Sequence, residues 1–431
     1  MSNQWPVTRV RAAVLLKNLR RRLNCPLLHL LKIAQHFSAG SSHKSEASPA
    51  GTKERSAVPA GLIPFFPSLP STKVLGYFQQ SRFFGRTQNS VCVFLAALAL
   101  ALFPTHAEEP APPVADSVVV DAPTEAVLNG ALRYLAEQQN GNGSWTSQGR
   151  KGEHPVAMTG YVLVCFLACG QLPEEGEYAK QVNEGMKFLL DSLMPDGTFR
   201  GVDGGKYMYN HGIATLALAE IYGQTKSLAI RTKLDRAVKL IVTTQSTKGP
   251  HAGGWRYRPR PDDADISVTV MQVVALRAAK NCGFDVPQRT IDDAIEYVKR
   301  CRVGNGGGFS YQAGGGGAGY ARTAAAIYSM QVCGLYDDPL VAAGSEYLFS
   351  KVNDTGEHWT YGSNYAAPAQ YMIGGDTWKR WYGTMREKLL KTVKKNGDQS
   401  YWEGDVGPVY CTAAHATILA MPYHYIPLYQ R

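Results

Sequence analysis

The chain has 431 residues, a formal net charge of +10 and 45% hydrophobic residues. The charge lies at the N-terminal end, because residues 1–107 carry 13 Lys and Arg but only Glu46 and Glu54 as acids. The other 324 residues carry 32 basic and 33 acidic side chains. A nearly neutral remainder lacks the basic surface that nucleic-acid binding requires. We therefore expect no nucleic-acid partner.

Residues 1–107 predict a targeting region. Residues 1–80 are rich in Ser, Arg and Pro, which indicates a disordered or wrongly assigned extension. Residues 81–107 contain an apolar run of 13 residues with Arg before it and small residues after it, the layout of a secretory signal. That run is short for a membrane span, which needs about 20 residues. We expect a secreted or periplasmic protein whose membrane contact is limited to this segment, or a form anchored by it, with a linker at 108–121.

Six Gly-rich turns that each end in an aromatic residue divide the rest of the chain. The aromatic residues are Trp145, Phe199, Trp255, Phe309, Trp359 and Trp402. They are 54, 56, 54, 50 and 43 residues apart. A recurring period of this length is typical of repeat proteins. The sequence therefore predicts six structural repeats over residues 122–431.

Each repeat contains two kinds of predicted helix. Residues 288–302 place Ile291, Ala294 and Val298 on one stripe, which is typical of a helix with one face in water. Residues 266–279 are apolar on every face, as in a helix surrounded by others. This alternation predicts an all-α fold without strands: a single closed (α/α)6 toroid of outer and inner helices. The alternative is an open solenoid, which would need polar capping repeats.

A Gly-rich turn that ends in Trp or Phe, between outer and inner helices, resembles the repeat of squalene–hopene cyclases, class II terpene cyclases and protein prenyltransferase β-subunits. The resemblance covers residues 122–431 and all six units. It implies the (α/α)6 toroid of this superfamily and isoprenoid cyclase or transferase activity on an apolar chain. Squalene-type cyclases resemble two such barrels, whereas this chain has residues for one.

The stretch PDDADISV, residues 261–268, is similar to the cyclase acid motif Asp-x-Asp-Asp-Thr-Ala, which precedes an inner helix at the cavity mouth. With Asp262 in first place, Ala264 stands at the central catalytic position. With Asp263 in first place, Asp265 is central but the last Asp is missing. The resemblance implies Asp265, Asp263 and Asp262 as catalytic acids of a degenerate motif. The alternative is that an aspartate here caps the following helix.

Protonation of an alkene requires a neutral carboxylic acid in an apolar cavity and aromatic faces that stabilise the resulting cation. Trp255 and Tyr257 are the candidates for those faces. In a closed ring the inner helices begin at one rim, which adds further side chains. The predicted substrate-binding residues are Trp255, Tyr257, His211, Tyr320, Arg322, Tyr365, Tyr410 and His415.

No cofactor or metal is expected. A prenyltransferase-type zinc site would require an Asp-x-Cys pair, which the sequence lacks, and Cys411 and His415 have no obvious third ligand. The predicted rim combines acidic, basic and aromatic side chains, so a second interpretation stays open: a non-catalytic toroid that binds protein or glycan at the rim. A third is a glycan-active enzyme that uses Asp263 and Asp265 as a carboxylate pair. The Gly-rich segment 307–322 is predicted to be a lid or a spacer.

Overall fold

The structure is a computed structural model, and the residues that it describes are 118–149, 153–200, 207–259, 262–354, 356 and 358–429. The predicted extension, the signal segment and most of the linker lie outside these residues. The first described helix begins at Ala122. None of the helices in this part of the chain combines the length and the hydropathy that a membrane span requires.

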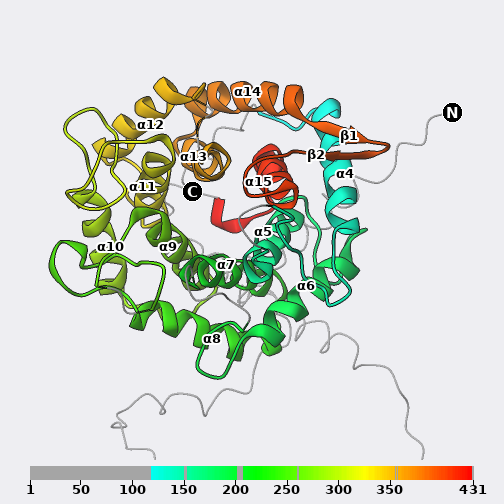
Figure 1. Ribbon diagram of the computed structural model, residues 1–431, viewed down its shortest axis with the longest axis horizontal. Helices are drawn as coiled ribbons and strands as arrows, with labels where there is room; N and C mark the ends of the chain where they lie inside the picture. The colour runs from blue at the N-terminus through cyan, green and yellow to red at the C-terminus, as the bar shows by residue number, and fades with distance from the viewer. Residues whose placement is uncertain are drawn as a thin grey trace, which may run out of the picture. The chain divides into compact units, whose positions relative to one another are not determined.

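Twelve α-helices of the described chain form two concentric rings (Figure 1). The outer helices are α4 (Ala122–Glu137), α6 (Ala179–Ser192), α8 (Leu228–Thr243), α10 (Gln288–Arg300), α12 (Pro339–Lys351) and α14 (Gly375–Thr392). The inner helices are α5 (Pro155–Ala168), α7 (Tyr207–Thr225), α9 (Ile266–Asn281), α11 (Tyr320–Val332), α13 (Trp359–Ile373) and α15 (Pro408–Ala420). The predicted alternation of outer and inner helices is confirmed.

The inner ring is closed. Each inner helix packs against the next, and α15 returns to α5. The outer ring closes where Arg386 of α14 meets the start of α4. Arg386 Nε donates to Thr124 Oγ1 at 2.9 Å, and its guanidinium pairs with Asp121, the N-cap of α4. The predicted (α/α)6 toroid is therefore confirmed, and the open solenoid is excluded.

The hydrophobic pattern decides which ring a helix joins. In α10 the buried side chains include Ile291, Ala294 and Val298, as the helical spacing predicts. In α5 every residue from Val156 to Ala168 is buried. A helix with a single apolar stripe keeps its polar face in water, whereas a helix that is apolar all round is stable only inside the ring.

The Gly/aromatic turns connect the two rings. Three of the aromatic residues donate their backbone N–H at 3.0–3.1 Å to the hydroxyl of a threonine 14 residues later on the inner helix: Trp145 to Thr159, Trp255 to Thr269 and Phe309 to Thr323. Three indole N–H groups donate to carbonyls near the end of an outer helix: Trp145 to Leu135, Trp255 to Ile241 and Trp402 to Leu389. Helix ends leave such carbonyls without intrahelical donors, so each indole satisfies one of them.

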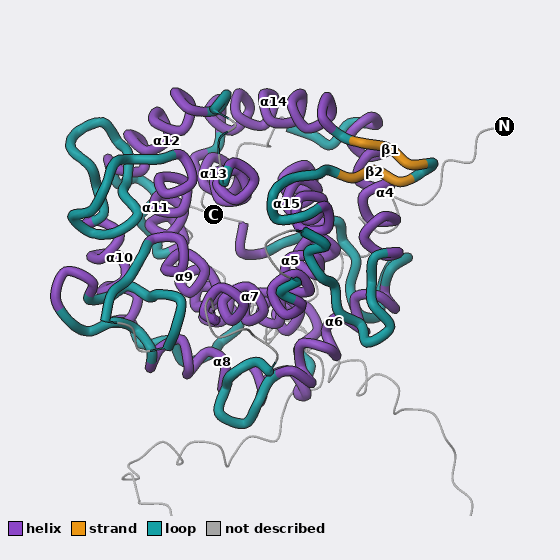
Figure 2. Tube along the Cα trace, in the orientation of Figure 1, coloured by secondary structure: helices purple, strands orange, loops and turns teal. Residues whose placement is uncertain are grey.

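A short hairpin interrupts the all-α pattern. Strands β1 (Lys394–Asn396) and β2 (Gln399–Tyr401) pair antiparallel across the two-residue turn Gly397-Asp398. Figure 2 shows them as the described strands, beside α4. The prediction of a fold without strands is wrong here. A Gly-Asp turn favours a hairpin, and the Tyr401 ring stacks on Tyr134 of α4 at 5.1 Å.

The two ends of the inner ring differ. The chain after α15 forms η2 (Met421–Tyr423) and η3 (Pro427–Tyr429), and η3 packs against α9 and α13. Figure 1 draws this segment in red in the middle of the ring. Ile426 and Leu428 are buried in it. We call this end, where the inner helices finish, the floor, and the end where they begin the mouth.

Candidate functional site

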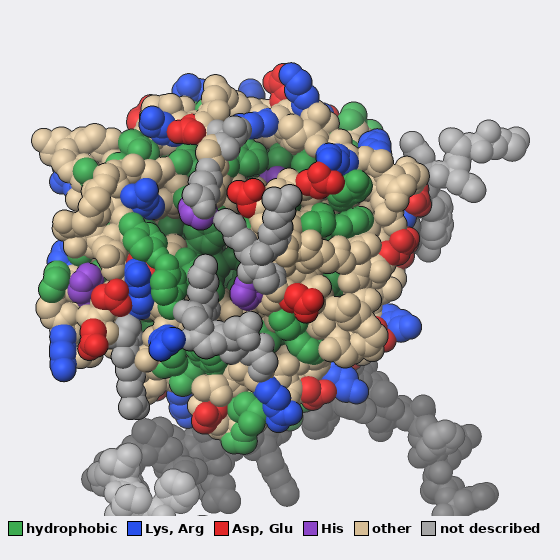
Figure 3. Space-filling model, in the orientation of Figure 1, with side chains coloured by type: hydrophobic (Ala, Val, Ile, Leu, Met, Phe, Trp, Pro, Cys, Tyr) green, Lys and Arg blue, Asp and Glu red, His purple; other side chains and the backbone are tan. Residues whose placement is uncertain are grey.

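A narrow central cavity of about 30 Å³ lies between the inner helices. All six inner helices contribute to its wall, whose residues are Tyr161, Val164, Ile213, Leu216, Met271, Val274, Tyr328, Asn364, Tyr365, Pro368 and Thr417. Figure 3 shows hydrophobic side chains gathered in the hollow at the middle of this face. This volume is room for about two water molecules, so a larger ligand requires side chains of the wall to move apart.

The described side chains of this wall are apolar or neutral. They lie in two layers, because residues three apart on a helix are one turn apart on the same face. Four helices each supply such a pair, the member nearer the mouth first: Tyr161 and Val164, Ile213 and Leu216, Met271 and Val274, Tyr365 and Pro368. None of the described lining residues carries a formal charge. The cavity is therefore suited to an uncharged, largely apolar molecule.

Tyrosine side chains cross the mouth above this cavity. Tyr209 of α7 and Tyr361 of α13 come from opposite helices of the ring, and their rings meet edge to face at 6.5 Å. Tyr361 Oη donates to the Ser267 carbonyl of α9 at 2.7 Å, and Tyr209 Oη is hydrogen-bonded to Ser267 Oγ. Tyr361 also contacts Tyr365, which lines the cavity, at 4.9 Å between ring centroids. Tyr209 and Tyr361 are not among the residues predicted from the sequence, although each is an aromatic at the third position of an inner helix.

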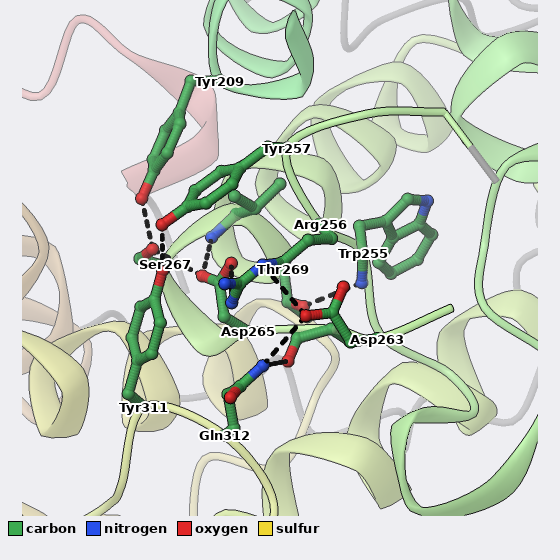
Figure 4. Close-up of polar contacts among 12 residues, drawn as sticks. Tyr209, Trp255, Arg256, Tyr257, Asp263, Asp265, Ser267, Thr269, Tyr311 and Gln312 are labelled. Carbon is green, nitrogen blue, oxygen red and sulfur yellow. Dashed lines mark hydrogen bonds and ion pairs between the residues drawn. The ribbon is translucent and has the colours of Figure 1, made fainter. Parts of the chain in front are cut away.

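Asp265 is the N-cap of α9 and is 0% exposed. Its Oδ1 accepts hydrogen bonds from Val268 N at 2.9 Å and Ser267 Oγ at 2.5 Å. Its Oδ2 accepts from Arg256 Nη1 at 3.1 Å (Figure 4). Burial raises the pKa of Asp265, while the hydrogen bonds and the charge of Arg256 oppose that rise. Asp265 therefore caps its helix, as the structural alternative predicts, and both of its oxygens are engaged.

Arg256 joins two of the three predicted acids. Its Nε lies 3.3 Å from Oδ2 of Asp263, a side chain that is 45% exposed. Asp262 is exposed in the preceding loop. The guanidinium carbon lies 4.4 Å from the ring centroid of Tyr257 and 5.3 Å from that of Tyr311, and the two phenols are hydrogen-bonded to each other. Figure 4 shows this cluster of opposite charges and aromatic faces at the mouth.

Three predicted binding residues lie in the wall between the rings instead. Trp255 is 0% exposed, with its indole on the Ile241 carbonyl. His211 Nε2 lies 3.0 Å from the Ala237 carbonyl of α8, and burial lowers the pKa of His211 to about 4. Burial lowers the pKa of His415 to about 3. These side chains point away from the ring axis, because an aromatic ring there fills the gap between helix layers.

His415 contacts two indole rings. Its ring centroid lies 5.6 Å from that of Trp359 and 5.4 Å from that of Trp402. Neither ring nitrogen has a hydrogen-bond partner among the described residues. The described chain also holds no group of three or more His, Cys, Asp and Glu side chains placed to bind a metal ion.

The remaining predicted residues are divided between the cavity and its rim. Tyr365 lines the cavity, and the buried Tyr410 meets the lining residue Tyr161 edge to face at 4.9 Å. Tyr320 Oη lies 3.4 Å from Ser363 Oγ. Arg322 Nη1 donates to the Gly317 carbonyl at 2.8 Å. Arg322 thus binds to the Gly-rich segment that precedes α11.

Solved structures share this architecture. Cellobiose 2-epimerase from Spirochaeta thermophila DSM 6192 is similar at a TM-score of 0.52 and 11% identity, over 70% of this chain and 96% of that one. The α-1,6-mannanase GH76A of Salegentibacter sp. HEL1_6 is similar at a TM-score of 0.50 and 8% identity, over 69% and 99%. A variant of the type II terpene cyclase MstE from Scytonema, in complex with geranylgeranyl dihydroxybenzoate, has a TM-score of 0.48 and 13% identity, over 70% and 98%.

These similarities concern the fold. The chain is an (α/α)6 toroid by its own helix packing, and the epimerase and the mannanase share this architecture. No protein-family model matches the sequence, and no curated protein matches it. The fold implied by the resemblance is therefore confirmed, while the ligand has to be argued from the cavity.

Proposed function

We propose that this protein binds an apolar chain of isoprenoid type in its central cavity. The observation that carries this proposal is the composition of the wall, to which all six inner helices contribute neutral side chains. Transfer of an apolar chain from water into such a wall is favourable by about 25 cal/mol per Å² of buried apolar surface. A glycan would leave most of its hydroxyl groups without partners there, which is costly.

The tyrosines support the same ligand class. Tyr161, Tyr328 and Tyr365 line the cavity, and Tyr361 and Tyr410 contact two of these rings. Aromatic faces offer a large contact area to a branched, unsaturated chain and stabilise positive charge on it. The cavity thus has the surfaces that isoprenoid binding requires, and the resemblance implies the same substrate class.

Binding is tested with farnesane, a saturated isoprenoid hydrocarbon, and the full-length chain. Val274→Phe places a ring in the cavity, and Leu228→Phe is the matched control because Leu228 is 79% exposed on α8. We expect mass spectrometry after gel filtration to find farnesane with the wild type and the control but not with Val274→Phe. Farnesane retained by all three proteins, or by none, contradicts the proposal. Mannotriose bound equally by all three would indicate a glycan site at the rim.

Catalysis by the acidic motif stays a prediction. It requires Asp265, with Asp263 and Asp262 beside it, to give up a proton to an alkene at the mouth. The test incubates lipid extracts with the wild type and with Asp265→Asn and compares the products by mass spectrometry. A product formed by the wild type alone supports the acid role. A product formed by both excludes Asp265 as the acid, and no product from either removes the enzyme hypothesis.

We also propose export through residues 81–107. The support for export is the layout of that segment in the sequence. The test expresses the full-length chain and sequences the N-terminus of the recovered protein. A mature protein that begins near Glu108 in the exported fraction supports the proposal, and an intact chain confined to the cytoplasm contradicts it.

A further inference from the structure

One buried carboxyl, that of Glu220, neither caps a helix nor belongs to the predicted acidic motif. Glu220 lies on the inner helix α7 and is 4% exposed. Among the described residues no hydrogen bond or ion pair is formed with its side chain, although a buried carboxyl usually has such partners. The burial of an unpartnered polar group costs free energy. The position of Glu220 on α7 suggests why the protein keeps a carboxyl there at this cost.

Three faces of α7 are occupied by neighbouring helices. His211 faces the outer helix α8, where its Nε2 meets the Ala237 carbonyl. Asn210 faces α5, because its Oδ1 accepts from the Ala157 N–H at 3.2 Å. The face towards α9 includes Ala219, whose carbonyl accepts from the Cys282 thiol at 3.3 Å.

The fourth face of α7 points to the ring axis. Tyr209 on this face crosses the mouth, and Ile213 and Leu216 line the cavity. Glu220 follows Ile213 by seven positions and Leu216 by four, so it continues the same stripe one turn nearer the floor. Side chains of a helix tilt towards its N-terminus, so the carboxyl of Glu220 is directed back to the cavity.

The surroundings keep this carboxyl neutral. Burial raises the pKa of Glu220 to about 8. At pH 7 the side chain is therefore a carboxylic acid, which donates one hydrogen bond as well as accepting others. Ile426 and Leu428, both buried in the segment that covers the floor, add further apolar surface at this end of the ring.

We propose that Glu220 binds the inner end of the chain through a hydrogen bond to an uncharged oxygen, which assigns the ligand to the isoprenoid alcohols or carbonyl compounds. This inference rests on the proposed function, because it places a polar contact one helical turn beyond Leu216, at the inner end of the same cavity. A diphosphate or carboxylate end does not suit this position, since the described lining residues include no basic side chain. A hydrocarbon would bind without using Glu220.

Other titratable groups at this end of the ring stay neutral near pH 8. Burial raises the pKa of Cys282, after α9, to about 11. The hydrogen bond with Cys165 and burial raise the pKa of Cys169, after α5, well above its usual range. Burial likewise raises the pKa of Tyr423, in η2.

The cationic side chains at this end have other contacts. Lys226, just after α7, lies 5.2 Å from the ring centroid of Tyr222, and Arg231 of α8 donates to Tyr222 Oη at 2.7 Å. Arg277 of α9 interacts electrostatically with the Cys333 thiol. Of the groups named here, Glu220 is the one whose charge changes near pH 8.

The test compares farnesol with farnesane, which differ in the terminal hydroxyl and in unsaturation, and adds farnesene to control for the double bonds. Affinities are measured for the full-length wild type, Glu220→Gln, Glu220→Leu and the control Glu296→Gln, a change at an exposed position of α10. At pH 6.5 we expect the wild type to prefer farnesol about three- to tenfold, as one net hydrogen bond provides. Glu220→Leu loses this preference, whereas Glu220→Gln and Glu296→Gln keep it.

The pH dependence separates a ligand contact from a structural role. Above pH 8 the affinity of the wild type for farnesal, the aldehyde, should decline, because its carbonyl can only accept a hydrogen bond and the carboxylate no longer donates one. The affinity of Glu220→Gln for farnesal should stay constant. Equal binding of farnesol and farnesene by the wild type, with Val274→Phe blocking both, overturns this inference and leaves the proposed function standing. If the wild type binds none of these ligands, both fail. A preference for farnesol that survives in Glu220→Leu also overturns the inference.

Discussion

Among the described residues, the mouth and the floor of the inner ring each contain one buried carboxyl, and the two have opposite environments. Asp265 at the mouth accepts hydrogen bonds from Val268, Ser267 and Arg256. Glu220 near the floor has no such partner in the described chain. Burial raises the pKa of both. A carboxyl whose oxygens are all engaged stabilises the fold, whereas one that is buried without partners costs stability and is the better candidate for ligand binding.

The largest expected effect is on stability at the mouth. Asp265→Ala removes the N-cap of α9 and the partner of Arg256, so the free energy of unfolding should fall by about 3–5 kcal/mol, the usual cost of breaking a buried pair. Urea denaturation measures this change. Asp265→Asn keeps an acceptor for the cap and should lose less. If Asp265→Ala costs under about 1 kcal/mol, the structural role assigned to Asp265 is wrong.

The next effect is the pH dependence of stability that Glu220 causes. Its pKa rises from the ordinary 4.5 to about 8 on folding, so the folded state holds this proton more tightly than the unfolded state. The free energy of unfolding should therefore fall between pH 5 and pH 8, by on the order of 3 kcal/mol. Glu220→Gln should remove this decrease. Parallel urea curves for the two proteins at both pH values would contradict the burial of an unpartnered carboxyl.

Two buried histidines should also make the free energy of unfolding depend on pH, by a smaller amount. Burial lowers the pKa of His415 to about 3 and that of His211 to about 4, so both are neutral when folded. The stability from these neutral rings is present above pH 6.5 and is lost as the pH falls. His415→Leu should therefore exceed the wild type at pH 5 by about 2 kcal/mol in unfolding free energy.

His211→Leu gives the contrast, because it also removes the contact of Nε2 with the Ala237 carbonyl. It should be about 1 kcal/mol less stable than the wild type at pH 7, where His415→Leu is expected to be neutral or stabilising. Denaturation of both variants at pH 7 measures this difference. Equal losses in the two variants would show that the hydrogen bond is not what distinguishes them.

The smallest expected effect concerns Ser267, which links Asp265 to the tyrosines of the mouth. Ser267→Ala removes the hydroxyl bonds to Asp265 and Tyr209, and should lower the free energy of unfolding by about 1 kcal/mol. The bond from Tyr361 to the Ser267 carbonyl remains. Because one of the two hydrogen bonds that hold the mouth tyrosines to Ser267 is lost, farnesane should also associate faster, which stopped-flow fluorescence detects. Unchanged stability and rate would contradict the link.

Much of the fold follows from local patterns in the sequence. The recurring Gly/aromatic turn sets the number of repeats, and the apolar stripe of residues 288–302 against the all-apolar surface of 266–279 separates outer from inner helices. Each pattern involves residues within a few helical turns of one another, so it can be recognised from the sequence without knowledge of tertiary contacts. The cap at Asp265 is local in the same way, since its acceptor is three residues from the donor.

The tertiary structure alone decided which side chains face the axis. An inner helix that is apolar all round has no polar face to orient it, so the sequence could not separate Tyr161, in the cavity, from His211 and His415, in the wall. The four-residue spacing places Glu220 on one stripe with Leu216, but it does not tell whether that stripe faces the axis. That direction is set by the packing of α7 between α5, α8 and α9, which involves residues far apart in the chain.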